Sequence, residues 1–408
     1  MKQEDKNKRK NTKDKTKERR SILSCRTYCL KLDKSKLNKK SKLVLNRLFL
    51  ETKWFYNFLL TQDFETFDTK IETVTILNKD KQPEQRDLKF LSSQMKQAIF
   101  TRTINNCSGL KETKKKGRKI GKLKFKSQVN SIPLKQFRDL TKENSSGTFW
   151  FVNEKLKIQN IKQKLKVNGF KQLNNFLEIS NAVLIKLGND YFINVTGYEN
   201  PKEFNPSCDL GVDFGIKDNL TFSNGIQVNI NIPESKQTKK IQRRISKSKK
   251  GSKNRFKLRL QLQKSYLKTT NKKKDVSNKI NSYLKQNCKI SMQDEMISNW
   301  HKGLFGKQVQ HSSMGEIKSL FKQNKHTFIV SKSFPSTQLC PICGCLTKLD
   351  LNQRIFKCEH CGFEEHRDLK SSKTILAERK EVKPMENLTS VEMFEYLNSI
   401  PNISVSWI

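Results

Sequence analysis

The sequence has no long apolar run and no apolar segment near its first residue. A transmembrane helix needs about 20 consecutive apolar residues, and no stretch of this chain approaches that length. Residues 1–20 are charged, which is unlike a secretory signal peptide. We therefore expect a cytoplasmic, nucleoid-associated protein. In that reducing compartment the 10 Cys act as free thiols or metal ligands rather than as disulfides.

Histidine and acidic residues are also scarce. The five His all follow residue 300 and share no ligand spacing, so they do not indicate a histidine metal centre. Only 39 Asp and Glu stand against 82 Lys and Arg, which gives a formal charge of +43. A lysine-biased surface from an AT-rich genome would raise this charge, but it would not cluster it. The clustered excess indicates a polyanionic partner, and nucleic acid is bound in this way through its phosphates.

Two basic segments are candidate nucleic-acid contacts. In 111–128, Gly117 and Gly121 let the backbone approach a phosphate, and an aromatic ring can stack on a base; a solvated loop is the alternative. Residues 236–279 hold 18 Lys and Arg and one acidic residue. They predict a long basic helix or helical hairpin. The candidate contact residues are Lys114, Lys115, Lys116, Arg118, Lys119, Lys124, Phe125, Arg243, Arg244, Lys249, Lys250, Arg255 and Arg259.

The pattern of apolar residues predicts a mixed α and β chain. Residues 148–200 are β-rich and indicate an antiparallel barrel or sheet, with a hairpin turn at Gly188. Residues 209–230 predict a strand, a turn at Asn224-Gly225 and another strand. Residues 380–408 show little pattern. Further strands are expected at 26–32, 289–295 and 328–334, and further helices at about 40–62, 85–110 and 367–379.

Four cysteines have the spacing of a structural zinc site. Cys340 and Cys343 form one CxxC pair, and Cys358 and Cys361 form a second pair after 14 intervening residues. Four thiolates in two such knuckles suit tetrahedral Zn²⁺. Cys345 or His360 could replace one of the four. The residues between the knuckles would form a ribbon hairpin, and the site predicts one structural zinc ion.

Separated carboxylates follow predicted strands or begin a predicted helix. Asp213 ends an apolar strand in the run LGVDFG, Glu295 closes the run KISMQDE, and Asp368 begins the last predicted helix, while Asp218 lies in a turn. Carboxylates brought together at a sheet edge are the ligands that two Mg²⁺ ions need for phosphodiester hydrolysis. Singly, Asp368 could be only a helix cap and Glu295 only an exposed strand end.

Taken in order, these motifs resemble the TnpB family, also called OrfB, of insertion-sequence transposons. The quoted residues are GVDFG around Asp213, a glutamate after a strand, a CPxC and CxxCG ribbon, and an RD pair that opens the last helix. Similar too are WFYN at 54–57, GRKIGKLKFKS at 117–127, QDEMISNWHKGLFGKQVQHSSMGEI at 293–317 and SFPSTQLCPICG at 333–344. The family is related to type V CRISPR effectors and to the eukaryotic Fanzor proteins.

The resemblance implies an RNA-guided, Mg²⁺-dependent DNA endonuclease with Asp213, Glu295 and Asp368 as its catalytic carboxylates. Its partners would be a guide RNA from the transposon end and double-stranded target DNA, with no membrane, and the chain would be a monomer or loose dimer. The alternative is a catalytically inactive RNA- or DNA-binding regulator of transposition or transcription. A DNA-joining transposase is disfavoured, because no tyrosine or paired-histidine constellation stands out.

The implied fold class is a multi-domain α+β chain, in which a β-barrel wedge domain with an inserted helical domain precedes an RNase H-like (RuvC) nuclease with an inserted zinc ribbon. The expected boundaries are 1–20 for a disordered basic tail, 21–45 and 126–205 for the wedge barrel, 46–125 for the helical recognition domain, 206–333 for the RuvC-like nuclease with a basic helical insertion at 236–288, 334–366 for the zinc ribbon that binds target nucleic acid, and 367–408 for the end of the nuclease and the C-terminal tail.

The sequence departs from the family pattern near two of the carboxylates. The last motif is usually DRD with an Asn shortly after it; here His366 takes the first acidic position and Lys370 replaces the Asn. A lysine within a turn of a Mg²⁺ site would repel the metal unless its side chain points away. Asp294 could serve as the metal ligand instead of Glu295. Met296 follows Glu295, where the family more commonly has Asp or Asn and then Leu.

Overall fold

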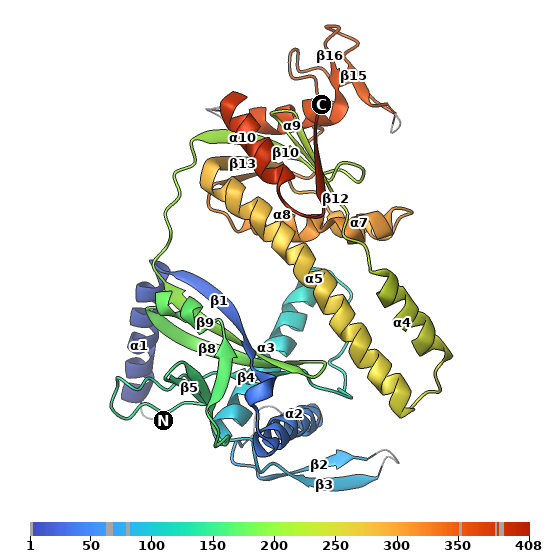
Figure 1. Cartoon of the computed structure of the whole chain (residues 1–408). Helices are drawn as coiled ribbons and strands as arrows, with labels where there is room; N and C mark the ends of the chain where they lie inside the picture. Colours follow the sequence, from blue (N-terminus) through green and yellow to red (C-terminus); the bar gives the residue numbers. More distant parts are fainter. Residues whose placement is uncertain (1–2, 63–67, 79–81, 351–352, 380–381, 383–386) are drawn as a thin grey trace. The chain divides into compact units, whose positions relative to one another are not determined.

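The computed structural model describes residues 3–62, 68–78, 82–350, 353–379, 382 and 387–408 (Figure 1). The chain divides into two compact units at residue 202. None of the helices in these described ranges is long and apolar enough to cross a membrane.

A seven-stranded antiparallel sheet is the centre of the first unit. Its strand order is β4-β8-β9-β1-β7-β6-β5, and a bridge between Phe137 and Phe149 links the two ends, so that the sheet is nearly a closed barrel. The predicted β-rich region and its turn at Gly188 are confirmed. The strands are β1 (Ser24–Leu32), β4 (Ser131–Leu134), β5 (Phe149–Val152), β6 (Lys155–Ile158), β7 (Leu165–Asn168), β8 (Glu178–Leu187) and β9 (Asp190–Glu199).

Alternate side chains of these strands fill the barrel. Leu30 and Leu32 of β1 face the same interior as Ile193 and Val195 of β9, and all four are buried. This alternation follows from the two-residue period of a strand, which sends every second side chain to one face. Short 3₁₀ turns complete the connections at Lys34–Lys36 and Phe170–Asn175.

Two helices and a β-hairpin are inserted after the first barrel strand. The helices are α2 (Lys39–Leu59) and α3 (Ser93–Lys115), which confirms the two predicted helices, although the second begins later than expected. Residues 83–87 form a strand instead: β2 (Thr73–Leu77) pairs with β3 (Pro83–Asp87). Ser92 explains the later start, because its side chain accepts a hydrogen bond from the Met95 N–H and caps α3.

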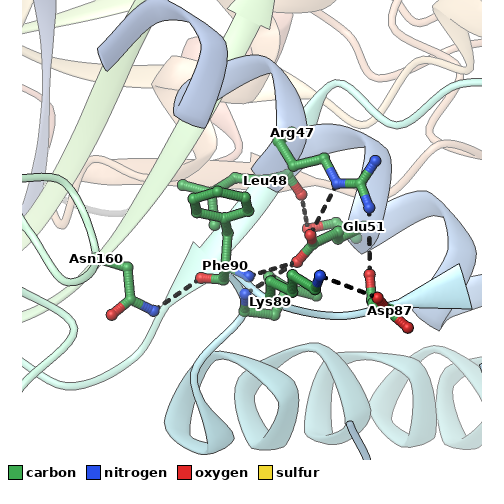
Figure 2. A network of polar contacts seen from close by, with 9 residues as sticks. Arg47, Leu48, Glu51, Asp87, Lys89, Phe90 and Asn160 are labelled. Carbon is green, nitrogen blue, oxygen red and sulfur yellow. Dashed lines mark hydrogen bonds and ion pairs between the residues drawn. The ribbon is translucent and has the colours of Figure 1, made fainter. Parts of the chain in front are cut away.

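A buried glutamate fixes this hairpin and α3 to α2 (Figure 2). Glu51 accepts a hydrogen bond from Arg47 Nε at 3.0 Å and two more from the backbone N–H groups of Phe90 and Leu91, at 2.9 and 3.1 Å. Asn160 donates to the Phe90 carbonyl at 2.9 Å. The carboxylate is fully buried yet satisfied by these donors, which is the condition for burying a charge.

The expectation of a disordered basic tail at 1–20 is wrong for residues 3–20, which belong to α1 (Gln3–Ser21). Its last turn is attached to the barrel: Arg19 and Arg20 both form ion pairs with Glu178 of β8, and the Arg20 guanidinium lies 4.5 Å from the centre of the Tyr198 ring. These contacts with Glu178 and Tyr198 attach the helix to the barrel, and the charge pattern of the segment does not predict them.

A six-stranded mixed sheet forms the second unit, in the order β14-β13-β10-β11-β12-β17. β10 runs parallel to β13, and β13 runs parallel to β14, whereas β11, β12 and β17 continue antiparallel. The predicted turn at Asn224-Gly225 is confirmed. The strands are β10 (Cys208–Asp213), β11 (Leu220–Phe222), β12 (Ile226–Ile230), β13 (Cys288–Gln293), β14 (Thr327–Val330) and β17 (Ile403–Trp407).

Helices cover this sheet and extend from it. The predicted basic helical hairpin is confirmed as α4 (Lys236–Lys247) and α5 (Lys253–Asn287) (Figure 1). Only the last part of α5 is anchored in the sheet's apolar core, through Val276, Ile280 and Leu284. The other helices are α6 (Ile297–Trp300), α7 (Gly306–Ser312), α8 (Met314–Lys322), α9 (Arg367–Ala377) and α10 (Asn387–Asn398).

The C-terminal segment has more structure than its sequence pattern suggested. β17 pairs with β12 along five residues, and Trp407 stacks on Phe394 of α10 at 5.3 Å between ring centres. A tail with weak periodicity becomes a strand here because β12 offers it a free edge to pair with.

The cysteine-rich region also differs from the expected single hairpin between the knuckles. β15 (Ile355–Lys357) pairs with β16 (Glu364–His366) around the second knuckle, and an isolated bridge between Leu339 and Leu346 encloses the first. Each cysteine pair therefore lies at the tip of its own hairpin. Residues 351–352 of the predicted ribbon lie outside the described residues.

Candidate active site and metal centre

Asp213, Glu295 and Asp368 line one cleft of about 1170 Å³ in the second unit. Asp213 is the last residue of β10, Glu295 follows β13 by two residues, and Asp368 lies in the first turn of α9. β10 and β13 are parallel neighbours, so their carboxyl ends meet at the same edge of the sheet. Asp218, in the turn after β10, lines the same cleft.

A glycine lets α9 approach the sheet closely enough to bring Asp368 to this edge. A Cβ atom at Gly211 of β10 would lie only 2.0 Å from the carbonyl oxygen of Ser372 and 2.9 Å from Leu376 Cβ. Any side chain there would push α9 away from β10. The glycine in the LGVD run thus serves the packing of the helix that carries Asp368.

The electrostatics of the cleft favour a bound cation. Burial, together with the negative charges of Asp368 and Glu295, raises the pKa of Asp213 to about 8. Burial also raises the pKa of Glu295, while the Lys318 ammonium acts in the opposite direction. Carboxylates that resist ionisation because they are buried beside one another are stabilised by a divalent ion, for which carboxylate oxygens are suitable ligands.

The two neighbouring acids after β13 have different environments. Asp294 forms ion pairs with Lys318 and Lys322, both at 2.6 Å, and the hydrogen bonds from these ammonium groups lower its pKa. Glu295 lines the cleft, which Asp294 does not. Asp294 therefore pairs with lysines of α8, and Glu295 is the acid of the two that lines the cleft.

Two arginines form ion pairs with Asp368. Arg367 Nε lies 3.2 Å from Asp368 Oδ1, and Arg354 Nη1 lies 3.4 Å from Oδ2. Arg354 immediately precedes β15, so it connects the cysteine-rich region to the cleft. Both arginines line the cleft. The sequence analysis named Arg367 only as part of the RD pair, and it missed Arg354 because only the fold brings that residue next to Asp368.

Lys370 points away from the carboxylates. Its side chain is fully buried, and Nζ donates hydrogen bonds to the carbonyl oxygens of Ser336 and Leu339 at 3.0 and 3.1 Å. The ammonium also lies 4.0 Å from the centre of the Phe356 ring. Lys370 is absent from the cleft lining and instead joins α9 to the segment that leads into Cys340.

The four cysteines converge as their spacing predicted. The ligand atoms of Cys340, Cys343, Cys358 and Cys361 all lie within 4.8 Å of one another. Two of the sulfur pairs are 3.6 and 3.5 Å apart, close to the roughly 3.8 Å between ligands of a tetrahedral site with Zn–S bonds of about 2.3 Å. This four-cysteine cluster could therefore bind a zinc ion.

Both knuckles have the same backbone geometry. Gly344 and Gly362 follow the second cysteine of each pair at φ values of +72° and +70°, and each donates its N–H to the carbonyl of the first cysteine. These left-handed turns favour glycine. A backbone N–H donated by Cys361 is the main cause that lowers the pKa of Cys358, to about 6, which favours the thiolate that a metal needs.

The two possible substitutes lie beside the cluster. Cys343, Cys345 and His360 form a second close group of ligand atoms. The Cys345 carbonyl accepts a hydrogen bond from the Cys340 N–H at 2.9 Å, so its backbone helps to shape the first knuckle. The four-cysteine set offers one more ligand and completes the tetrahedral coordination.

The predicted nucleic-acid-binding residues lie mostly on exposed surface. Those of 111–128 are exposed, including Phe125 at 64%, and belong to the end of α3 and the loop beyond it. Within residues 236–279, all of which the structure describes, Lys279 forms an ion pair with Asp275. Arg255 differs from its neighbours, because its guanidinium donates to the carbonyls of Ile245 and Ser248 and thereby closes the turn between α4 and α5.

Two family models match parts of the chain. One, described as "Cas12f1-like, TNB domain", covers residues 318–375, which include the four cysteines and Asp368. The other, OrfB_IS605, is described as "Probable transposase" and covers residues 192–293, which include Asp213. Glu295 lies between the two matched segments.

A curated relative and a solved structure are among the proteins to which the chain is similar. A protein of Streptomyces pristinaespiralis named "Putative RNA-guided DNA endonuclease" is 28% identical over 179 residues, which are 41% of this chain and 44% of that protein. The matched part thus spans less than half of the relative's length. A structure described as "Cryo-EM structure of the Cas12f1-sgRNA-target DNA complex" has 13% identity and a TM-score of 0.47, and the match covers 89% of this chain and 100% of that one.

Proposed function

We propose that this chain, which is a TnpB-like protein, is an RNA-guided, Mg²⁺-dependent DNA endonuclease encoded by an insertion-sequence transposon. The observation that carries the proposal is the meeting of Asp213, Glu295 and Asp368 in one cleft. The name of the Streptomyces pristinaespiralis relative supports the same activity.

The carboxylates fit a pair of Mg²⁺ ions. They are oxygen ligands from three separate parts of the chain. The raised pKa of Asp213 reflects its burial and, after that, the negative charges of Asp368 and Glu295, both of which a bound cation would offset. Bound Mg²⁺ would supply an activated water and would neutralise the charge of the leaving oxygen. Asp213, Glu295 and Asp368 would hold the ions.

The other residues of the cleft would bind and orient the DNA backbone. Arg354 and Arg367 pair with Asp368; if bound metal ions neutralised that carboxylate, the two guanidinium groups would be available to a phosphate. Lys217 and Lys332 also line the cleft and offer two further cations. The arginines would therefore exchange a carboxylate partner for a phosphate partner when substrate and metal bind.

The rest of the chain suits the proposed division of labour. The near-closed barrel with its inserted helices would be the wedge and recognition domains. The second sheet, in which three antiparallel strands adjoin parallel ones, suits an RNase H-like nuclease. The basic hairpin of α4 and α5 would contact guide or target strands, and the four-cysteine region would be the target-nucleic-acid-binding module.

One observation favours the alternative of a binding protein that does not cut. Asp368 is held by two arginines, and His366 stands where the family usually has an acid. If metal ions do not displace these arginines, the chain would bind guide RNA and DNA without hydrolysis.

The two functions are separated by one experiment. The protein is expressed from its native locus, purified, and the RNA that accompanies it is sequenced. A discrete RNA with a constant scaffold and a variable end supplies the target for cleavage assays over a Mg²⁺ titration. The endonuclease proposal requires cutting that Asp213→Ala abolishes; binding without cutting at any Mg²⁺ concentration establishes the regulator, and random or absent RNA contradicts guided activity.

A further inference from the structure

The carboxylate cleft also has an aromatic side that the proposed hydrolysis does not use. Trp300, at the end of α6, and Phe305, just before α7, line the cleft together with the three carboxylates. Trp300 packs against the apolar core of the second unit, whereas Phe305 is 53% exposed and belongs to none of the described core clusters. Phe305 thus presents an aromatic face to the solvent of the cleft.

The backbone around Phe305 is closely held. Gly303 donates its N–H to the Trp300 carbonyl, and Gly306 donates to the Gly303 carbonyl at 3.1 Å. A Cβ atom at Gly306 would lie 2.4 Å from the carbonyl oxygen of His301, so the turn closes only with glycine at that position. The Phe305 carbonyl accepts a hydrogen bond from Val309 and begins α7. The exposed ring therefore stands on a fixed turn rather than on a loose loop.

The same cleft carries cations that suit phosphates. Lys217, Lys332, Arg354 and Arg367 line it alongside the aromatic residues. A surface for an apolar peptide would not need four cations and four carboxylates around one exposed ring. Aromatic rings beside cationic groups are instead the combination that binds single-stranded nucleic acid, in which the bases stack and the phosphates pair.

We propose that Phe305, supported by Trp300, stacks on an unpaired base next to the scissile phosphate and so positions the DNA strand over the carboxylates. This inference rests on the proposed nuclease function. Stacking between a base and an aromatic side chain tolerates every base, which suits an enzyme whose sequence choice comes from a guide. Loss of the ring should weaken use of the substrate about 5- to 150-fold.

The chain offers a matched control. Leu304, the adjacent residue, is 99% exposed but does not line the cleft. Leu304→Ala removes an exposed apolar side chain from the same turn, and Phe305→Ala removes one that faces the cleft. Phe305→Trp retains an aromatic face, whereas Phe305→Leu retains only apolar character.

The test uses the protein with its co-purified guide RNA and a DNA target. After the wild-type cut is mapped, 2-aminopurine is placed beside the cut, and its fluorescence is measured in complexes of Asp213→Ala with Mg²⁺. We expect quenching that Phe305→Ala and Phe305→Leu remove, and that Phe305→Trp and Leu304→Ala keep. In the cleaving background, Phe305→Ala and Phe305→Leu should lose about 5- to 150-fold in cleavage at low target concentration, Phe305→Trp should lose less than Phe305→Leu, and Leu304→Ala should stay near wild type.

Each other outcome overturns the inference in a recognisable way. If the wild type cuts and Phe305→Ala keeps both quenching and rate, the stacking role is wrong while the nuclease stands. If Leu304→Ala and Phe305→Ala weaken cleavage equally, the turn is an apolar protein-docking patch instead. If the wild type does not cut at all, the proposed function fails first, and this inference fails with it.

Discussion

Lys370 Nζ donates a hydrogen bond to the carbonyl oxygen of Ser336 at 3.0 Å, and Ser336 Oγ in turn donates to Gln293 Oε1 at 2.8 Å. Gln293 ends β13 just before the Glu295 region, and Lys370 lies in α9 two residues after Asp368. Ser336 thus joins the elements that carry two of the candidate catalytic carboxylates. Lys370, which the sequence placed close to a possible metal site, thus belongs to the hydrogen-bond network that holds the carboxylate-bearing elements together.

Replacing Lys370 should therefore weaken the frame rather than strengthen metal binding. In Lys370→Met the apolar stem keeps its packing, but the carbonyls of Ser336 and Leu339 lose their donor, at a cost of about 1–3 kcal/mol in the free energy of unfolding. Denaturant unfolding measures the loss, and Lys373→Met, at an exposed ion pair, serves as the control. A variant with unchanged stability and a lower Mg²⁺ requirement for cleavage would contradict this orientation.

The pH dependence of stability should report the environment of Asp213. Its pKa is raised in the folded chain, from an ordinary value of 3.8 to about 8, so the folded state holds one more proton than the unfolded state between these values. The contribution of Asp213 to stability is thus greatest at low pH and falls as pH rises, by about 1.4 kcal/mol per pH unit.

Asp213→Asn removes this titration. Without Mg²⁺, the variant should gain stability relative to wild type as pH rises towards 8, and added Mg²⁺ should stabilise wild type more than the variant. Unfolding midpoints measured from about pH 5 to pH 8 check both effects. A difference between the two proteins that does not change with pH would show that Asp213 titrates normally.

The zinc site makes a prediction about metal content. Cys358→Ser should abolish stoichiometric zinc in the purified protein and unfold the small core around Phe356, because the metal and its ligands fold together. Cys345→Ser should retain zinc, and elemental analysis distinguishes the two. If Cys345 or His360 replaced the missing thiolate, Cys358→Ser would keep its metal. A double mutant that combines Cys358→Ser with Cys345→Ser or with a His360 substitution would then lose the metal.

The basic hairpin should bind nucleic acid through its exposed arginines. Each phosphate contact that is lost, as in Arg244→Ala or Arg259→Ala, should lower the slope of log affinity against log salt concentration by about one. Arg255→Ala is a matched control with a different expected effect, since its guanidinium closes the turn between α4 and α5. It should lower helix stability, measured by circular dichroism, with a smaller change in salt slope. Unchanged slopes in all three variants would contradict a role in phosphate binding.

Glu51 provides a stability prediction for the first unit. Glu51→Ala leaves the N–H groups of Phe90 and Leu91 without their carboxylate acceptor and removes the partner of Arg47, which should cost about 3–5 kcal/mol. Glu112→Ala removes an exposed ion pair with Lys115 and should cost no more than about 1 kcal/mol. Equal effects in denaturant unfolding would show that the buried network contributes little.

Local sequence patterns determined much of this protein. The two CxxC pairs indicated the four-cysteine cluster, because the thiolates of a knuckle lie only three residues apart and a short turn brings them together. The β-rich runs and the turn at Gly188 predicted the barrel region, and the run of lysines and arginines predicted a long basic helix or the hairpin that α4 and α5 form. The order of the motifs led to the family that the comparisons support.

Only the tertiary structure decided which distant side chains share a site. Glu295 rather than Asp294 faces the cleft because α8 supplies two lysines to Asp294, and Lys370 points away because Ser336 and Leu339 offer it carbonyls. Arg354, Trp300 and Phe305 join the carboxylates only once the sheet, α6 and the cysteine-rich region are assembled. Side-chain direction depends on partners far along the chain, and no local pattern carries that information.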